Sequence, residues 1–174
     1  METRELLNSI YRPLHEKGRA VCSAITKNGY RARLGYFNMH EVKVDNVYQT
    51  EYFPMPEIDI YDIALYANVG ISLDLSMWME LTIDRERALG INYEKLAEKA
   101  VPEVYGANNY LHDFFGPASD PSDIKNIINL IFSSEEDQIY LQFSFQTADS
   151  DALLALLGYL RENKVIASST VSGI

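Results

Sequence analysis

The chain has 174 residues, of which 47% are hydrophobic, and its formal net charge at pH 7 is −10. This length and apolar content suit a single packed domain over residues 1–174, and no repeat, low-complexity tract or long linker divides the chain. No stretch approaches the roughly eighteen consecutive apolar residues of a membrane span, and the start is too acidic for a signal peptide, so we expect a cytoplasmic protein.

The charge is distributed unevenly along the chain. Residues 1–50 hold eight Lys or Arg and five Asp or Glu, a net charge of +3, whereas residues 51–174 hold seven and twenty, a net charge of −13. Such a negative field repels phosphate backbones, so we expect no nucleic acid to bind the larger part. The acidic part favours a basic partner, or it serves only to keep the protein in solution.

The N-terminal region is predicted to be helical. Apolar residues fall on one stripe from Thr3 to about Lys17, and Pro13 should kink or restart the helix because it removes a main-chain hydrogen bond. A second helical run extends from Arg19 to Lys27, with Gly18 as the expected division. The single cysteine, Cys22, excludes an internal disulfide and a cysteine-based metal cluster, and its apolar neighbours indicate a small buried side chain rather than a nucleophile.

Two strands are predicted after the helical region. Side chains alternate in polarity from Tyr30 to Phe37, and the segment Asn38–His40 indicates a turn. Residues 41–50 indicate a second strand, which Asp45-Asn46 should interrupt with a bulge or a loop.

A proline-containing segment follows, with a further strand after it. The prolines of Tyr52–Pro56 lack a backbone donor and restrict the residue before them, so this segment is not expected to be the interior of a central strand. We expect an extended strap over the core, with the rim of a binding groove as the alternative. Residues 57–67 again have the pattern of a strand.

The segment Val69–Ile83 has an apolar residue at every odd position, which is the period of a strand. Fully extended it would span about 50 Å, more than the roughly 40 Å diameter expected for a domain of this length. We therefore predict a hairpin about Asp74-Leu75-Ser76, with one long bent strand as the alternative. The predicted cross-strand pairs are Leu73 with Met77, Ile71 with Met79 and Val69 with Leu81.

The rest of the chain is predicted to be mostly helical, with one late strand. We expect a charged break at 84–87, a short helix capped by Asn92 and ended by Pro102, and a helical stripe over 105–117. A further helix should begin at Asp120-Pro121, with a buried face that includes Leu130. A strand over 138–146, a helix capped by Asp149 or Ser150, and a frayed tail over 165–174 complete the chain. This order predicts an α+β fold, with an antiparallel sheet of five to six strands, a central meander plus the late strand, and helices packed on one face.

Few residues in the sequence indicate catalysis. The three histidines have no metal-ligand spacing, and the chain contains no phosphate-binding loop, dinucleotide fingerprint or nucleophile elbow, so we expect no metal and no cofactor. His112 and Asp113 are the best candidates for acid–base chemistry, which makes a small enzyme the alternative function. Both residues also suit the polar face of an aromatic helix with no functional role.

The other face of the predicted sheet is more distinctive. Asp59, Trp78, Glu80 and Tyr140 would combine carboxylates with aromatic rings there, and Asp74, Asp84 and Gln142 add polar groups nearby. Such a surface suits a basic protein or peptide, through charge pairing and cation–π contact. An ordinary solvated face, or one covered by a helix, explains the same pattern. The leading hypothesis is a non-enzymatic interaction module, with homodimerisation through a sheet edge as a further possibility.

Several short segments resemble a family of small uncharacterised proteins, mainly archaeal, that is catalogued as a domain of unknown function. The similar segments are Tyr52-Phe53-Pro54, Val69-Gly70 with its hairpin, Tyr105-Gly106, the run from Tyr110 to Phe115, and Ser133 to Glu136. They cover about the C-terminal two-thirds of the chain. The resemblance implies an α+β fold and favours the hairpin over the long strand. It supplies no catalytic residues.

Overall fold

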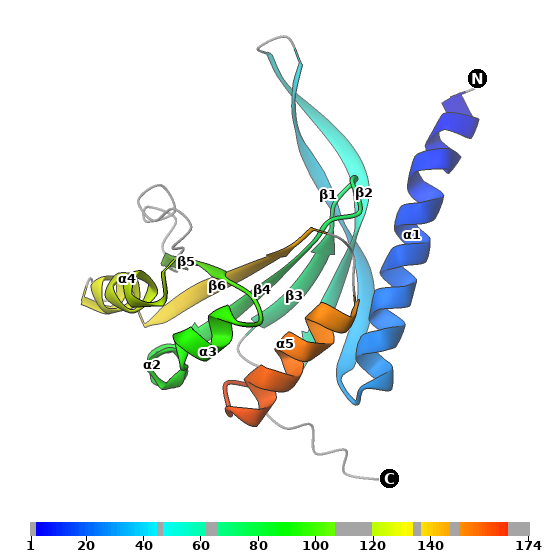
Figure 1. The fold of residues 1–174 in the computed structure, drawn as a ribbon. Coiled ribbons are helices and arrows are strands. Elements are labelled where there is room, and N and C mark those ends of the chain that lie inside the picture. Colours follow the sequence, from blue (N-terminus) through cyan, green and yellow to red (C-terminus); the bar gives the residue numbers. More distant parts are fainter. Residues whose placement is uncertain are drawn as a thin grey trace.

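The computed structural model describes residues 3–44, 47–61, 66–106, 120–133, 137–146 and 150–166. Its strands form one six-stranded antiparallel sheet in the order β1-β2-β3-β4-β6-β5. The strands are β1 (Arg31–Val44), β2 (Val47–Tyr61), β3 (Tyr66–Ile71), β4 (Met77–Asp84), β5 (Pro102–Gly106) and β6 (Gln138–Phe145). The helices are α1 (Thr3–Lys27), α2 (Arg85–Gly90), α3 (Tyr93–Ala97), α4 (Pro121–Ser133) and α5 (Ser150–Glu162). Figure 1 shows these helices on one side of the sheet, and the α+β prediction is confirmed.

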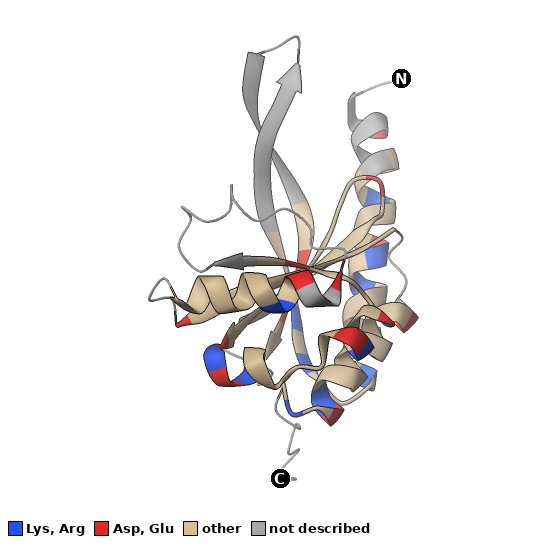
Figure 2. Ribbon diagram, turned by 60° about the vertical axis from the view of Figure 1, so that its left-hand side comes forward, with Lys and Arg blue, Asp and Glu red and all other residues tan. Residues whose placement is uncertain are grey.

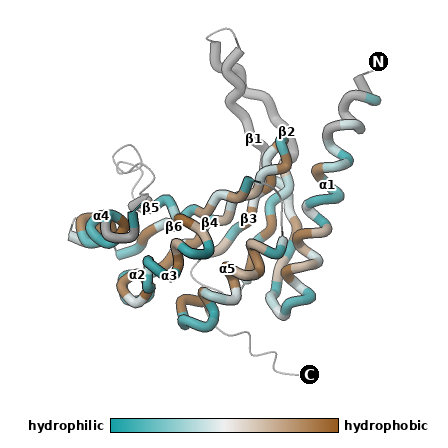
Figure 3. Tube along the Cα trace, in the orientation of Figure 1, coloured by the Kyte–Doolittle hydropathy of each residue, from teal (hydrophilic) through white to brown (hydrophobic). Residues whose placement is uncertain are grey.

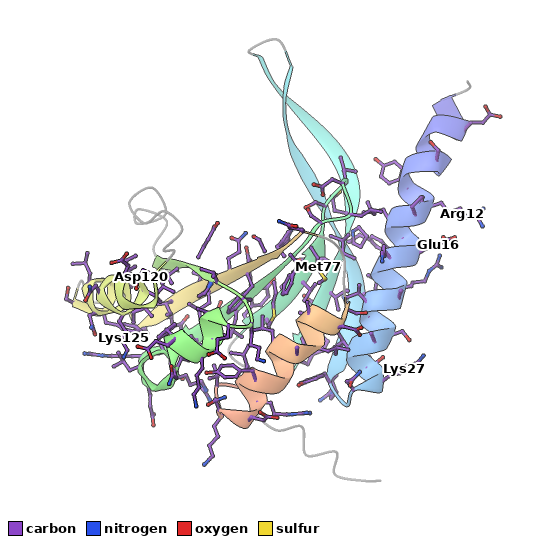
Figure 4. All side chains as sticks on the ribbon, in the orientation of Figure 1. Arg12, Glu16, Lys27, Met77, Asp120 and Lys125 are labelled. Carbon is purple, nitrogen blue, oxygen red and sulfur yellow. The ribbon has the colours of Figure 1, made fainter. Side chains whose placement is uncertain are left out.

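The hydrophobic core lies between the helices and the apolar face of the sheet. Odd-numbered residues of β4 and β6 form one cluster with leucines of α5, and Phe145 at the end of β6 is only partly buried. The fully buried members are Met77, Met79, Leu81, Ile83, Ile139, Leu141, Phe143, Leu153, Leu156, Leu157 and Leu160. Burying each such side chain contributes about 1.5–3 kcal/mol. Apolar and polar positions alternate along α1 and α4 (Figure 3), as expected for helices with one buried face. Figure 4 shows Met77 inside the body, whereas Arg12 and Lys27 point outward from α1.

Helix α1 is continuous, so the predicted division at Gly18 is wrong. Pro13 lies inside the helix on its exposed side, where the missing hydrogen bond faces solvent. Gly18 is buried, and a Cβ atom there would lie 2.7 Å from Cβ of Pro56 on β2. The glycine therefore allows the helix to approach the sheet closely and does not end it.

The β1–β2 ribbon corrects three predictions. Asn38–His40 is part of β1, with a register shift between Met39 and Glu41, and the strand continues until Val44 pairs with Val47. The proline segment is part of β2 and not a connector. The strand predicted over 57–67 is divided between β2 and β3.

The prolines of β2 are accommodated by the arrangement of its neighbours. The ladder to β1 runs without interruption across Pro54 and Pro56, which requires both residues to direct their nitrogen atoms away from β1. On that other side, β3 pairs with β2 only over Glu57–Asp59. The missing donors therefore fall where β2 has one neighbour instead of two.

The central hairpin is confirmed, and the single long strand is wrong. Ile71 pairs with Met77 and Gly70 with Trp78, so the register differs by two residues from the predicted one. The turn closes with a Ser72 N–H to Ser76 O hydrogen bond of 2.9 Å, and Leu75 takes the left-handed position with φ of 64°. Because side chains alternate with period two, a shift of two leaves the strand residues on their predicted faces. Leu73 is the exception, since it lies in the turn and is 53% exposed instead of pairing with Met77 on the buried face.

The C-terminal half contains one unpredicted strand. Pro102 begins β5 instead of ending a region, and Tyr105-Gly106 belongs to this strand instead of a helix. A proline is tolerated there because it is the first residue of an edge strand. The charged segment 84–87 is not a break, since Asp84 caps α2.

Three other C-terminal predictions are confirmed and two are wrong, whereas most of the helical stripe predicted over 105–117 and the tail beyond residue 166 lie outside the described residues. Asn92 caps α3, α4 begins at Pro121, and the late strand is β6. Leu130 is 57% exposed and not part of the buried face of α4. The predicted tail is wrong for residues 165–166, which are buried. None of the helices that the structure describes has the length and apolar character required to span a bilayer.

Candidate functional site

Opposite the core, the sheet presents its second face, which we call the polar face. Alternation places the even-numbered residues of β3, β4 and β6 there, together with Glu57 and Asp59 of β2 and Glu103 of β5. The helices of the described part of the chain lie on the opposite side of the sheet (Figure 1). This face is therefore the large surface of the described fold on which a ligand could lie.

The central row of the polar face alternates carboxylates with amides. Across neighbouring strands, Asp59 pairs with Asn68, Asn68 with Glu80, Glu80 with Gln142, and Gln142 with Glu103. We call Asp59, Glu80 and Glu103 the acid row. Adjacent strands are about 4.8 Å apart, so backbone positions of successive acids are separated by about 10 Å. Each intervening amide keeps two like charges off directly opposed positions.

Asn68 lies at the centre of the most acidic part of this face. Its side-chain nitrogen donates a hydrogen bond to a carboxylate oxygen of Glu57 and approaches Oδ1 of Asp59 at 3.5 Å. Asn68 has an exposed fraction of 0%, and its carbonyl oxygen Oδ1 has no hydrogen-bond partner among the described residues. The amide thus links two acids of β2 and retains an unused buried acceptor.

The indole ring of Trp78 lies directly on Gly70. A Cβ atom built on Gly70 would be 2.1 Å from Cζ2 and 2.2 Å from Cε2 of the ring, so no side chain fits beneath it. The two residues are opposite each other on β3 and β4, and Trp78 is partly buried. Trp78 is thus one row away from the acid row and held against the backbone of the sheet.

Tyrosines border the acid row on its other side. Tyr66 and Tyr140 both lie opposite Thr82, and Tyr66 is 42% exposed. Burial raises the pKa of the Tyr66 hydroxyl, and the negative charge of Glu57 raises it further. The larger effect of burial does not depend on neighbouring charges, and only the smaller effect of Glu57 reflects negative charge on this face. The acid row therefore lies between aromatic side chains.

The structure places the four predicted binding residues on one face. Asp59 and Glu80 belong to the same row, Trp78 lies one row above it and Tyr140 one row below it. Their role in binding stays a prediction. His112 and Asp113 lie outside the described residues.

Two further acids named from the sequence have local structural roles. Asp74 accepts hydrogen bonds from the backbone and hydroxyl of Ser76, which lower the pKa of its carboxyl group. Asp84 caps helix α2 and contacts Arg87. Neither Asp74 nor Asp84 belongs to the acid row.

Sequence reasoning missed Glu57, Asn68, Tyr66 and Glu103. Glu57 and Tyr66 lie at positions that the predicted 57–67 strand did not assign to a face, and Asn68 lies between that strand and the segment Val69–Ile83. Glu103 lies in the unpredicted strand β5. The sequence did contain an indication that Glu57 and Asp59 share a face, since these two acids alternate with Ile58 and Ile60, which are buried.

Other surfaces of the described chain are less distinctive. No group of three or more His, Cys, Asp or Glu in that part of the chain has a geometry suited to a metal ion. Surface hollows of about 360 and 380 Å³ lie around α2, and Arg87 and Lys164 line the first while Lys125 lines the second. Figure 2 shows both signs of charge interspersed on the helices. Asp84 and Glu86 also line the first hollow and Glu94 the second, so neither hollow has a single sign of charge. The sheet edges are β1 and β5, and homodimerisation through one of them stays a prediction.

Comparisons with known proteins support the fold and no function. No family model matches the chain, and no curated protein matches it. A conserved hypothetical protein from Pyrococcus furiosus has a similar structure, with a TM-score of 0.59, 16% sequence identity, and coverage of 93% of this chain and 96% of that chain. At this identity the similarity shows the fold alone. The resemblance to an archaeal family of unknown function stays a prediction.

Proposed function

We propose that this chain is a non-enzymatic interaction domain that binds a basic segment of another protein on the polar face. The observation that carries the proposal is the acid row, with carboxylates on β2, β4 and β5 at one level of the sheet and Trp78 beside it. Carboxylates attract cationic side chains, and an aromatic ring adds a cation–π contact.

The expected affinity from the charge and ring contacts is weak, with a Kd of about 1 mM or higher, and depends on salt. A partly exposed charge pair contributes about 0.2–1 kcal/mol, and an exposed cation–π contact contributes about 0.5–1 kcal/mol. Three pairs and one ring contact therefore supply about 1–4 kcal/mol, before any apolar contact with the tyrosines. Charge pairs of this kind weaken as ionic strength shortens the Debye length to about 8 Å at 0.15 M salt.

A direct binding measurement tests the proposal. An oligolysine peptide is titrated into the full chain, with heat and the fluorescence of Trp78 as readouts. We expect Glu80→Lys to weaken binding about tenfold or more, because it replaces an attraction with a repulsion at the centre of the acid row. Trp78→Ala should also weaken binding of the oligolysine peptide, because the cation–π contact with the ring is lost.

The matched control is Glu98→Lys, which makes the same charge change at an exposed residue after α3, on the helical side of the sheet. Both variants shift the net charge of the protein by the same amount. Circular dichroism establishes that each variant is folded. Equal weakening by the two substitutions would show attraction by net charge alone and would overturn the placement on the polar face.

A further inference from the structure

We infer that Asn28, at the C-terminal end of α1, is a site of spontaneous deamidation that the folded turn between α1 and β1 protects. Asn28-Gly29 is the only Asn-Gly step in the chain. In such a step the side-chain carbonyl carbon of asparagine reacts readily with the next main-chain nitrogen, because glycine has no side chain to block the approach and rotates freely. This chemistry is independent of the polar face and of its proposed function.

The reaction needs only the chain and water. The nitrogen of Gly29 bonds to Cγ of Asn28 while the bond from Cγ to Nδ2 breaks, and Nδ2 leaves as ammonia with the proton that Gly29 gives up. The product is a cyclic succinimide. A water molecule then opens the ring at either carbonyl carbon, which gives aspartate or isoaspartate. No group is oxidised or reduced.

In the folded protein, hydrogen bonds fix both groups that would react. Nδ2 of Asn28 donates to the carbonyl oxygen of Ala24 at 2.9 Å, and the N–H of Gly29 donates to the carbonyl oxygen of Thr26 at 3.1 Å. Gly29 gives up this proton when its nitrogen bonds to Cγ, so its hydrogen bond to Thr26 cannot persist. Cγ must also rotate towards that nitrogen, which draws Nδ2 away from Ala24. The reaction therefore waits until this end of α1 opens.

The turn opens more easily than the rest of α1, because it lies at a helix end. Gly29 has φ of 86°, and the N–H of Tyr30 donates to the carbonyl oxygen of Ile25 at 3.4 Å, as in the Schellman ending of a helix. Asn28 and Gly29 are exposed, so water reaches both. Tyr30 is buried and anchors the far side of the turn in the core. Protection is therefore a matter of how often the last turn opens.

Either product changes the end of α1. A carboxylate replaces the amide, so the hydrogen bond from Nδ2 to Ala24 is lost and a negative charge lies at the helix C-terminus, where the helix dipole disfavours it. In isoaspartate the main chain also runs through the side-chain carbons of residue 28, which lengthens the backbone before the buried Tyr30. Deamidation thus loosens the connection between α1 and β1.

Asn163 is an internal control with the same local structure. Its Nδ2 donates to the carbonyl oxygen of Tyr159 at 2.8 Å, and the next residue, Lys164, has φ of 59°. The N–H of Lys164 donates to the carbonyl oxygen of Arg161 at 3.0 Å, as that of Gly29 does to Thr26. The two asparagines therefore end their helices in the same way, and only the residue that follows each one differs.

Peptide mapping of the full chain by mass spectrometry measures the reaction, after incubation at mildly alkaline pH in buffer or in guanidinium chloride. We expect Asn28 to convert at least about tenfold faster in the unfolded chain than in the folded one. In the unfolded chain Asn163 should convert about tenfold more slowly than Asn28, because the lysine side chain hinders the attack. Lys164→Gly should remove that difference. Equal conversion of the two asparagines without this substitution would overturn the role of glycine.

A pair of variants tests whether opening of the last turn controls the rate. Ala24→Gly and Ala20→Gly make the same change in helix propensity, in the last turn of α1 and one turn earlier. Only Ala24→Gly should accelerate conversion of Asn28 in the folded protein, by about fivefold. Circular dichroism establishes that both variants are folded.

Three outcomes would contradict the assignment of Asn28. Absence of conversion at Asn28 in the unfolded chain would overturn the site itself. Equal rates in the folded and the unfolded chain would overturn protection by the turn. Equal acceleration by Ala24→Gly and Ala20→Gly would show that the reaction requires a larger opening of α1, and would overturn control by the last turn.

Discussion

The contact between Gly70 and Trp78 gives a sharp test of how the polar face is built. Replacing Gly70 by alanine would put a methyl group 2.1 Å from Cζ2 of the indole ring, whereas carbon atoms in contact are about 3.5–4.0 Å apart. The ring must therefore move by about 1.5 Å or rotate away. It cannot move toward the backbone, so it must lift toward solvent.

The expected cost of Gly70→Ala follows from two opposing effects. Overpacking of this kind destabilises a protein by about 1–3 kcal/mol. Alanine also restricts the unfolded chain more than glycine does, which stabilises by about 0.4–1 kcal/mol. We therefore expect a net loss of about 0.5–2 kcal/mol in the free energy of unfolding. Peptide binding on the polar face should weaken as well, because the displaced ring no longer borders the acid row.

The assay uses the intrinsic fluorescence of the protein, which has one tryptophan. Urea unfolding followed by Trp78 emission gives the stability, and the emission maximum of the folded state reports solvation of the ring. Gly70→Ala should shift the emission to longer wavelength and lower the unfolding midpoint. The matched control is Gly35→Ala, since a Cβ atom there lies 3.8 Å from the nearest atom and should be neutral or stabilising. Unchanged emission and stability in Gly70→Ala would refute the reasoning.

Three further predictions concern other parts of the fold. Gly18→Ala should destabilise by about 1–3 kcal/mol in urea unfolding, despite the better helix propensity of alanine, because its methyl group meets Pro56 at 2.7 Å; a gain in stability would contradict this close approach. Lys164→Gly should raise the melting temperature by a few degrees, because the exposed Lys164 has φ of 59° after α5 and glycine relieves about 1 kcal/mol of backbone strain. A lower melting temperature in this variant would contradict the prediction. Burial raises the pKa of Tyr93, whose hydroxyl donates to the carbonyl of Ala88, so its contribution to stability is complete below about pH 10 and is lost as pH rises further. Tyr93→Phe should flatten this alkaline decline in pH-dependent urea unfolding, and an unchanged slope would contradict it.

The period-two pattern of Val69–Ile83 was enough to predict which face each residue of β3 and β4 in this segment occupies, although the register was wrong by two residues and Leu73 lies in the turn. Face and register depend on different physics. The side-chain period fixes the face, whereas the turn fixes the register, and here Leu75 adopts the left-handed position that glycine normally takes. The prediction that Trp78 and Glu80 share a face depended only on the period of this segment, so it did not require the correct turn.

The wrong predictions come from sequence rules that do not take account of the residues that become neighbours in the fold. Gly18 indicated a helix break because glycine is a poor helix former, but its role depends on Pro56, which is distant in the sequence. Strand β5 was missed because a five-residue segment beginning with Pro102 is too short to show a period. Without β5, the sequence could not place Glu103 in the acid row.

The position of the two prolines in β2 also bears on how the molecule avoids aggregation. Beyond Glu57, β2 has a side that no strand of the described chain pairs with, and such sides recruit strands from other molecules. Pro54 and Pro56 remove consecutive donors from that side, so an incoming strand would find carbonyl groups without the amides needed to complete a ladder. The long ribbon can therefore extend beyond the body of the sheet without offering that side as a template for intermolecular pairing.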